Sequence, residues 1–263
     1  VAGLRAVEIS AAVAGPEASE PPAPAKGARL VSVFAHALIG TRPPRSNRRW
    51  LFVPYDQLHD RMGPLLHEPP GELGIVLVES RGKAGRRPYH RQKLALVLTN
   101  LRHFAIEQQL RGVLVRHVTT EGGYAEALAP LVRELGPLRV QRPAERELRV
   151  ELQPLLANGS LVEVPHDGWL STTDDFAAIA GPPWRMDAFY RQVRRRTGVL
   201  MQDGKPRGGK FSFDTENRRA WSGEPPAPEP PTFQPDAITR EVCALVERAV
   251  RSHPGTLRPE HLP

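Results

Sequence analysis

Cysteine is nearly absent from this sequence of 263 residues, in which Cys243 is the only one. A single thiol cannot form an internal disulfide, and it cannot supply the four thiolates of a zinc or iron–sulfur site. Long apolar runs are also missing, since none approaches the roughly 20 residues that a membrane-spanning helix needs. The N-terminus lacks the succession of charged, apolar and small residues that marks a secretory signal. We therefore expect a soluble, cytoplasmic protein that holds no metal and contacts no membrane.

Several catalytic and nucleotide-binding motifs are absent as well. No GxSxG nucleophile elbow occurs, and the histidines show neither HxxxH nor HxxEH spacing. The first apolar run is followed by PYDQL (residues 54–58), where a dinucleotide cradle would need a glycine fingerprint. GKPRGGK at 204–210 fits GxxxxGK, but Phe211 stands where the Ser or Thr that binds magnesium belongs. We interpret that match as fortuitous.

Positive charge is in excess, with 36 Lys and Arg residues against 29 Asp and Glu. Of the 36, 31 are Arg, a skew that GC-rich coding would produce without selection for phosphate binding. Two stretches still stand out: residues 81–93 hold six basic residues and no acidic one, and residues 185–219 hold ten basic and four acidic residues. These stretches predict nucleic-acid contacts, and a solvated charged surface is the alternative.

Composition divides the chain into four regions. Residues 1–48 are rich in Pro, Ala and Arg, so we expect a disordered or poorly ordered extension there. Residues 49–222 carry the pattern of one α/β domain. Residues 223–234 form a Pro-rich linker, and residues 235–263 begin a helical region that is truncated where the sequence stops.

Short apolar runs alternate with helical periods in the second region. Repeated strand–helix–strand units form a parallel sheet with right-handed crossovers. We therefore predict an α/β fold, Rossmann-like or flavodoxin-like, with about five strands and flanking helices. The run at 204–219 is too rich in Gly and charge for regular structure. Strands are expected at 50–55, 74–79, 113–118, 138–141 and 161–165, and helices at 89–110, 124–135, 145–157, 171–180, 186–196 and 236–252.

Polar side chains follow several of the predicted strands. In open α/β sheets, ligands bind at the carboxyl ends of the strands. A ligand pocket there competes with the simpler interpretation that these residues only cap helices and form turns. The candidates are Tyr55, Asp56, Gln57, Glu79, Glu145 and Asp167.

The basic candidates come from both charged stretches. On the predicted helix 186–196, Arg191, Arg194 and Arg195 lie opposite an apolar face, so they could bind a phosphate backbone. A surface helix with a solvated charged face is the alternative. From the first stretch, the candidates are Arg86, Arg87 and Arg91.

Residues 189–219, FYRQVRRRTGVLMQDGKPRGGKFSFDTENRR, resemble the signature stretch of the photolyase-related proteins. These form the branch of the cryptochrome/photolyase superfamily that carries an iron–sulfur cluster. Further likenesses occur in the same order along the chain, and together they cover about residues 50–250. They are PYDQL (54–58), IVLVE (75–79), HRQKLALVLTNLRHFA (90–105) and PDAITREV (235–242).

The resemblance implies a light-driven flavoprotein that repairs ultraviolet-damaged DNA or signals light. It further implies FAD and a 4Fe–4S cluster in a helical C-terminal domain, and a lumazine-type antenna on the α/β domain, lined by Tyr55, Asp56, Gln57, Glu79 and Glu145. This chain has neither the family's FAD region nor its four cysteines, so we expect no FAD, cluster or catalytic residue in it. Residues 80–87 also depart from the family, since they are basic where an acidic, small-residue stretch is usual, and Val78 replaces a cysteine that some members have.

Two functions follow. In the first, the sequence is the N-terminal part of a photolyase-like lyase or blue-light photoreceptor, inactive until a C-terminal flavin domain completes it. In the second, it is a stand-alone α/β module that binds nucleic acid or a small aromatic ligand without catalysis.

Overall fold

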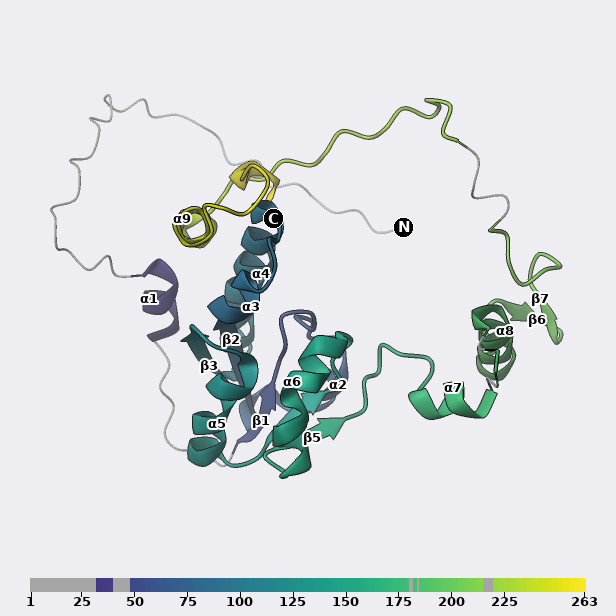
Figure 1. Cartoon of the computed structure of the whole chain (residues 1–263), viewed down its shortest axis with the longest axis horizontal. Helices are drawn as coiled ribbons and strands as arrows, with labels where there is room; N and C mark the ends of the chain where they lie inside the picture. Colours follow the sequence, from purple (N-terminus) through teal and green to yellow (C-terminus); the bar gives the residue numbers. More distant parts are fainter. Residues whose placement is uncertain (1–31, 40–47, 180–181, 184, 215–219) are drawn as a thin grey trace, which may run out of the picture. The chain divides into compact units, whose positions relative to one another are not determined.

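The structure is a computed structural model in which part of the chain is described (Figure 1). Most of the extension predicted for residues 1–48 lies outside this part, as do residues 215–219 of the second basic stretch. All statements below concern the described residues. These are residues 32–39, 48–179, 182–183, 185–214 and 220–263.

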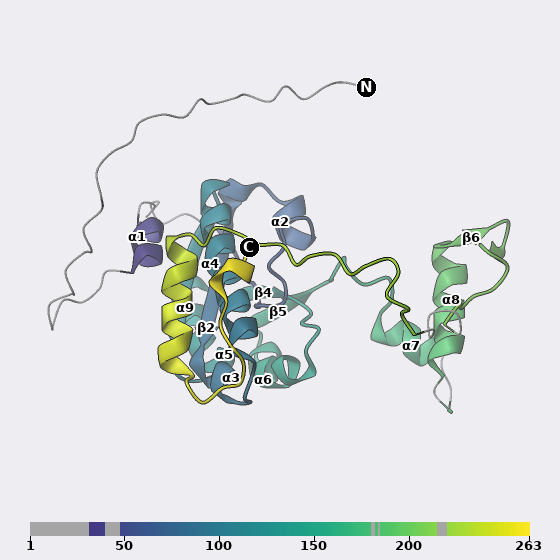
Figure 2. The same cartoon turned by 90° about the horizontal axis from the view of Figure 1, so that it is seen from above.

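A five-stranded parallel sheet lies at the centre of the α/β unit (Figures 1 and 2). Its strands run in the order β3-β2-β1-β4-β5, so the direction of the crossovers reverses between β1 and β4. The predicted α/β fold with a five-stranded parallel sheet is confirmed. The strands are β1 (Arg49–Phe52), β2 (Leu73–Ser80), β3 (Leu114–Thr120), β4 (Leu138–Gln141) and β5 (Leu161–Val164).

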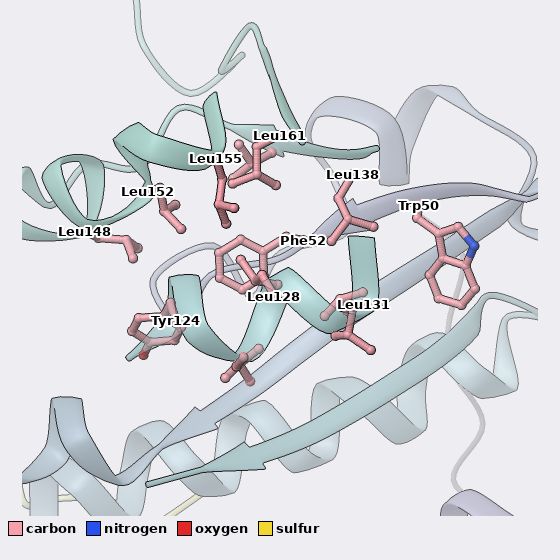
Figure 3. Packing of buried hydrophobic residues seen from close by; sticks show 14 residues of the cluster. Trp50, Phe52, Tyr124, Leu128, Leu131, Leu138, Leu148, Leu152, Leu155 and Leu161 are labelled. Atoms are coloured by element: carbon pink, nitrogen blue, oxygen red, sulfur yellow. The ribbon is translucent and has the colours of Figure 1, made fainter. Parts of the chain in front are cut away.

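Helices cover both faces of the sheet, and alternate residues of the strands reach opposite layers. On β2, Val76 and Val78 pack with α5 (Tyr124–Leu135) and α6 (Arg146–Ala157), in the cluster that Figure 3 shows around Phe52. Ile75 and Leu77 pack on the other face, with Leu101 and Phe104 of α4 (Arg91–Leu110). Because both faces are covered, the strand is apolar along almost its whole length.

Helix α1 (Val33–Ile39) departs from the poorly ordered extension predicted for residues 1–48. Its Phe34 is buried in the same cluster as α4. The ring of Phe34 meets His117 edge-on at a centroid distance of 4.8 Å, and the Arg102 guanidinium lies 5.1 Å from its centre. The N–H groups of Phe34 and Ala35 also donate to Glu241 and to the Ser32 hydroxyl, at 3.4 and 3.1 Å, so burial and hydrogen bonds together hold this helix.

Helix α9 (Ala237–Ala249) packs against α4, and Figure 2 shows the two helices side by side. Val242, Val246 and Leu262 are buried with Ala95 of α4. The sequence predicts that residues 235–263 begin a C-terminal helical region. In the structure, α4 buries the apolar face of α9.

A smaller group of elements follows the sheet: α7 (Thr173–Ile179), α8 (Met186–Thr197) and a two-stranded hairpin. The hairpin pairs β6 (Met201–Gln202) with β7 (Lys205–Pro206), and β7 lies in the segment 204–219 that was predicted to be irregular. Its turn residues Asp203 and Gly204 have φ angles of 49° and 73°. Positive φ at both central residues is what a two-residue type I′ hairpin turn requires.

The remaining helical elements are short. None of the helices in the described ranges is long and apolar enough to cross a membrane. The short helical elements are α2 (Gly63–His67), α3 (Arg81–Gly85) and the 3-10 turns Pro70–Glu72 and Pro259–His261.

Candidate functional site

Three polar side chains meet at the carboxyl ends of the central strands. Tyr55 follows β1, Lys83 lies in α3 directly after β2, and Glu145 lies between β4 and α6. The Tyr55 hydroxyl donates to Glu145 Oε2 at 2.7 Å, and the Lys83 ammonium pairs with Glu145 Oε1. Lys83 Nζ also lies 5.9 Å from the centre of the Tyr55 ring. The cluster therefore occupies the point where the strand order reverses, the usual ligand position in this class of fold.

The three groups fix one another's protonation states. Burial would raise the pKa of Glu145, but hydrogen bonds from Lys83 and Tyr55 outweigh it and lower that pKa. Burial would lower the pKa of Lys83, but its bond to Glu145 reverses the effect and raises it. Burial, together with the hydrogen bond to Glu145, raises the pKa of Tyr55. At neutral pH the cluster consists of an ammonium, a carboxylate and an un-ionised phenol.

An aromatic wall and an exposed carboxyl group border this cluster. The rings of Tyr55 and Tyr124 stack at a centroid distance of 6.3 Å, and burial raises the pKa of the Tyr124 hydroxyl. Asp56 is exposed to solvent. The pKa of its carboxyl group is nevertheless raised, chiefly by partial desolvation and also by the negative charge of Glu145. The site thus offers a ring surface beside donors and acceptors of both charges.

The other predicted pocket residues lie elsewhere. Gln57 is buried, and its side-chain amide donates to the carbonyls of Gln141 and Arg142, both at 3.2 Å, so it fastens the loop after β1 to the loop after β4. Asp167 accepts hydrogen bonds from the Gly63 N–H and from His67, in the loop after β5. Neither residue forms a hydrogen bond or ion pair with Tyr55, Lys83 or Glu145 in the described part of the chain.

Glu79 lies on the opposite face of the sheet from the Tyr55 cluster. It forms a two-point ion pair with Arg102 of α4, at 2.7 and 3.0 Å, and His117 Nε2 lies 3.0 Å from its carboxylate. This buried ion pair joins β2 to α4.

Lys83 is the member of the cluster that the prediction of the pocket missed. Ser80 caps α3 by accepting a hydrogen bond from the Lys83 N–H at 2.9 Å, which turns the chain sharply after β2. Its position just after a predicted strand could have identified Lys83 as a pocket residue. It was counted instead with the basic residues of the stretch 81–93.

Most of the first basic stretch is paired internally. Arg86 lies 3.4 Å from Glu151, Arg87 pairs with Glu147, and both acids belong to α6. The Arg91 Nε donates to the carbonyl of Gly255 at 2.8 Å. The three arginines of this stretch that were predicted to bind phosphate therefore already have hydrogen-bond or ion-pair partners inside the chain.

The second basic stretch is divided by burial. Arg194 is buried, with 5% of its surface exposed, and its guanidinium donates to the carbonyls of Phe211 (2.9 Å) and Leu200. Its predicted place on the solvated face of the helix is wrong, because these carbonyls, from either side of the hairpin, accept its hydrogen bonds and it is buried. Arg191 and Arg195 remain exposed, and their guanidinium carbons lie 5.9 and 5.1 Å from the centre of the Phe211 ring.

Comparison with known proteins identifies the family. Residues 51–262 match the family described as deoxyribodipyrimidine photo-lyase-related protein. The chain belongs to this photolyase-related family. A relative named (6-4) photolyase, from Agrobacterium fabrum (strain C58 / ATCC 33970), is 34% identical over 213 residues. That match covers 77% of this chain and 42% of the relative, so the chain spans less than half of the relative's length. The predicted resemblance is confirmed.

The cofactors that the photolyase-related family implies fit this chain unequally. Its single cysteine, Cys243, is buried in the α4–α9 cluster, so the chain has no set of four thiolates for an iron–sulfur cluster. In the described ranges, no three His, Cys, Asp or Glu side chains are grouped to hold a metal ion. An antenna chromophore fits better, because Tyr55, Lys83 and Glu145 combine an aromatic face with a donor and an acceptor.

Proposed function

We propose that this chain is the antenna-type α/β part of a photolyase-like flavoprotein that repairs ultraviolet-damaged DNA or signals light. In this proposal a longer polypeptide supplies FAD and a 4Fe–4S cluster, and the Tyr55 cluster binds a lumazine-type antenna. The observation that carries the proposal is the meeting of Tyr55, Lys83 and Glu145 at the reversal point of the sheet. Family membership supports it.

The chemistry of the cluster suits a heteroaromatic ligand with ring carbonyls and ring nitrogens. Lys83 can donate to a carbonyl oxygen, and the carboxylates of Glu145 and Asp56 can accept from N–H or hydroxyl groups. The stacked rings of Tyr55 and Tyr124 present an apolar surface. Both Glu145 oxygens have lone pairs beyond those used by Tyr55 and Lys83, so a ligand can bind without breaking the ion pair.

Titration with a ribityllumazine tests the antenna site. The ligand's fluorescence would be followed as the purified chain is added, and we expect saturable binding. Glu145→Gln removes the charge that orders Lys83 and Tyr55, so we expect it to weaken binding by about tenfold, the effect of losing one charge-assisted hydrogen bond. Glu134→Gln is the matched control, because Glu134 is an exposed partner of Arg116 outside the site.

Absence of saturable binding by the folded wild-type chain would refute the antenna site. Equal weakening by Glu145→Gln and Glu134→Gln would move the site away from the Tyr55 cluster.

The coding sequence that follows would distinguish this proposal from the second one, a stand-alone module that binds a ligand without catalysis. We expect the codons that follow in frame to encode a helical region with four cysteines. A chain that binds the lumazine but has no such continuation would be a stand-alone ligand-binding module.

A further inference from the structure

We propose that helix α8 and the β6–β7 hairpin bind DNA phosphates, whereas the basic stretch around α3 does not. This assignment rests on the proposed function, in which DNA is the partner, and it goes further by naming the surface and its residues. It follows from what remains of each basic stretch after its internal ion pairs have formed.

The exposed face of α8 has a shallow hollow with excess positive charge. Asp187 is the acidic residue of its lining, and it lies 3.3 Å from Arg185 and 3.5 Å from Arg191. Arg195 has no carboxylate within 4.0 Å among the described residues. Three guanidinium groups therefore face one carboxylate, which leaves charge for an incoming anion. The hollow is lined by Arg185, Asp187, Ala188, Arg191, Gln192 and Arg195.

Contacts with residues on either side of the hairpin hold these guanidinium groups in place. The ring of Phe211 supports Arg191 and Arg195, at 5.9 and 5.1 Å from its centre. The buried Arg194 anchors the same segment to α8 through the carbonyls of Phe211 and Leu200. Since long side chains lose entropy when a ligand orders them, arginines already stacked on a ring pay less on binding a phosphate.

The hairpin adds basic side chains to the same segment. Lys205 lies in β7 and Arg207 directly follows it, and both are exposed. Neither pairs with a carboxylate in the described part of the chain. Over residues 185–214 there are eight Lys and Arg against three Asp and Glu, and one of the eight, Arg196, pairs with Asp175 of α7. Such an excess attracts a polyanion and releases its counterions.

The α3 stretch contrasts with α8 in this respect. Four of the six basic residues at 81–93 pair with carboxylates: Arg81 with Glu121, Lys83 with Glu145, and the next two arginines with carboxylates of α6. Arg91 donates instead to the carbonyl of Gly255, and Lys93 lies over the ring of Tyr89. A phosphate would have to displace these carboxylates, so binding there would gain little from counterion release. The two stretches have the same net charge when residues are counted along the sequence. They differ in how much of that charge is paired with carboxylates elsewhere in the chain.

The experiment measures binding of the full chain to a fluorescein-labelled DNA duplex of about 20 base pairs, by anisotropy, from about 50 to 200 mM salt. We expect Arg195→Gln to weaken binding by about eightfold at 0.1 M salt and to reduce the slope of log K against log salt by about 0.9, because one fewer counterion is released. Lys205→Gln should act in the same direction. Asp187→Asn should strengthen binding, since it removes the carboxylate from the hollow. Arg86→Gln is the control and should leave both affinity and slope unchanged.

Circular dichroism would confirm that each variant is folded, and Lys205→Gln replaces Arg195→Gln if that variant is not. A reduced slope in Arg86→Gln with an unchanged slope in the α8 and hairpin variants would overturn the assignment while DNA remained the partner. No binding at the lowest salt would overturn both the assignment and the DNA partner. The lumazine titration uses different residues, so its outcome is independent of this one.

Discussion

The ion pair between Glu79 and Arg102 joins the sheet to α4, and removing one partner should destabilise the fold severely. Both side chains are nearly inaccessible, with 6% and 7% of their surfaces exposed. Arg102 also contacts Glu241 of α9 at 2.7 Å, which in turn accepts a hydrogen bond from Ser32 at 2.6 Å. Arg102→Met would therefore leave two carboxylates without their shared cation, one of them deep in the core.

Two lines of reasoning give the same magnitude. Breaking a buried ion pair by removing one partner costs about 3–5 kcal/mol. Independently, burial alone would raise the pKa of Glu79, but hydrogen bonds from His117 and Arg102 lower it from 4.5 to about 2. At about 1.36 kcal/mol for each pKa unit, this shift corresponds to about 3 kcal/mol of stability. Because the folded-state pKa is the lower one, this contribution is complete above about pH 4.5 and is lost as the pH falls towards 2.

Urea unfolding followed by far-UV circular dichroism measures the effect. At pH 7 we expect Arg102→Met to lower the free energy of unfolding by about 3–5 kcal/mol. Glu79→Gln with Arg102→Met should cost less than the sum of the single changes, because no unpaired charge then remains at that position. The deficit of Glu79→Gln should fall to about half at pH 3. Arg81→Gln, which breaks the exposed pair with Glu121, should cost less than about 1 kcal/mol.

A loss below about 1 kcal/mol in Arg102→Met would refute the reasoning, since an exposed pair can account for that much. So would a deficit of Glu79→Gln that stays constant between pH 7 and pH 3.

Two smaller perturbations test local features by thermal unfolding. Asp236 caps α9 by accepting from the Thr239 N–H at 2.7 Å, so Asp236→Ala should cost about 1 kcal/mol and Asp236→Asn much less; equal losses would contradict the cap. A Cβ at Gly74 would lie 2.5 Å from the ring of Trp50, so Gly74→Ala should cost about 1–3 kcal/mol. Gly71→Ala, with nothing within 4 Å of its Cβ, is the control, and a comparable loss there would contradict the steric explanation.

The central sheet could be predicted because its local and global signals agree. Helix Tyr124–Leu135 and strand Leu138–Gln141 have the predicted bounds. Glycines lie at both ends of the helix, and the strand lies between Pro137 and Pro143. The first strand was predicted to reach residue 55, but it ends at Phe52. Pro54 follows closely and has no N–H to continue the ladder of hydrogen bonds.

The hairpin and the place of α9 could not be predicted in the same way. Asp203-Gly204 is a recognised turn signal, but the strands beside it are two residues long, too short for an alternation pattern. The apolar face of α9 was evident from its periodicity, yet its partner α4 lies more than a hundred residues earlier in the chain. Periodicity identifies an apolar face but says nothing of what covers it.

The site was predicted in part, and the parity of β2 explains the main error. Val76 and Val78 face α5 and α6, so Glu79, one residue further, faces the opposite layer. Tyr55 and Glu145 do meet, because the carboxyl ends of neighbouring parallel strands lie at the same edge of the sheet. A strand period of two, applied to the predicted pocket, would have removed Glu79 from it.

The two basic stretches show why charge along a sequence is a poor guide to a binding surface in this fold. Strands β2 and β4 flank β1, so the basic segment after β2 and the acidic start of α6 after β4 come together, although some 60 residues separate Arg87 from Glu147. Parallel topology therefore pairs charges that no local window contains. In the stretch around α8, Arg196 pairs with Asp175 of α7, and Asp187 lies beside Arg185 and Arg191. Arg195 and Lys205 have no carboxylate partner in the described chain. What attracts a polyanion is the charge left after such internal pairing, and by that criterion we expect α8, rather than α3, to contact DNA.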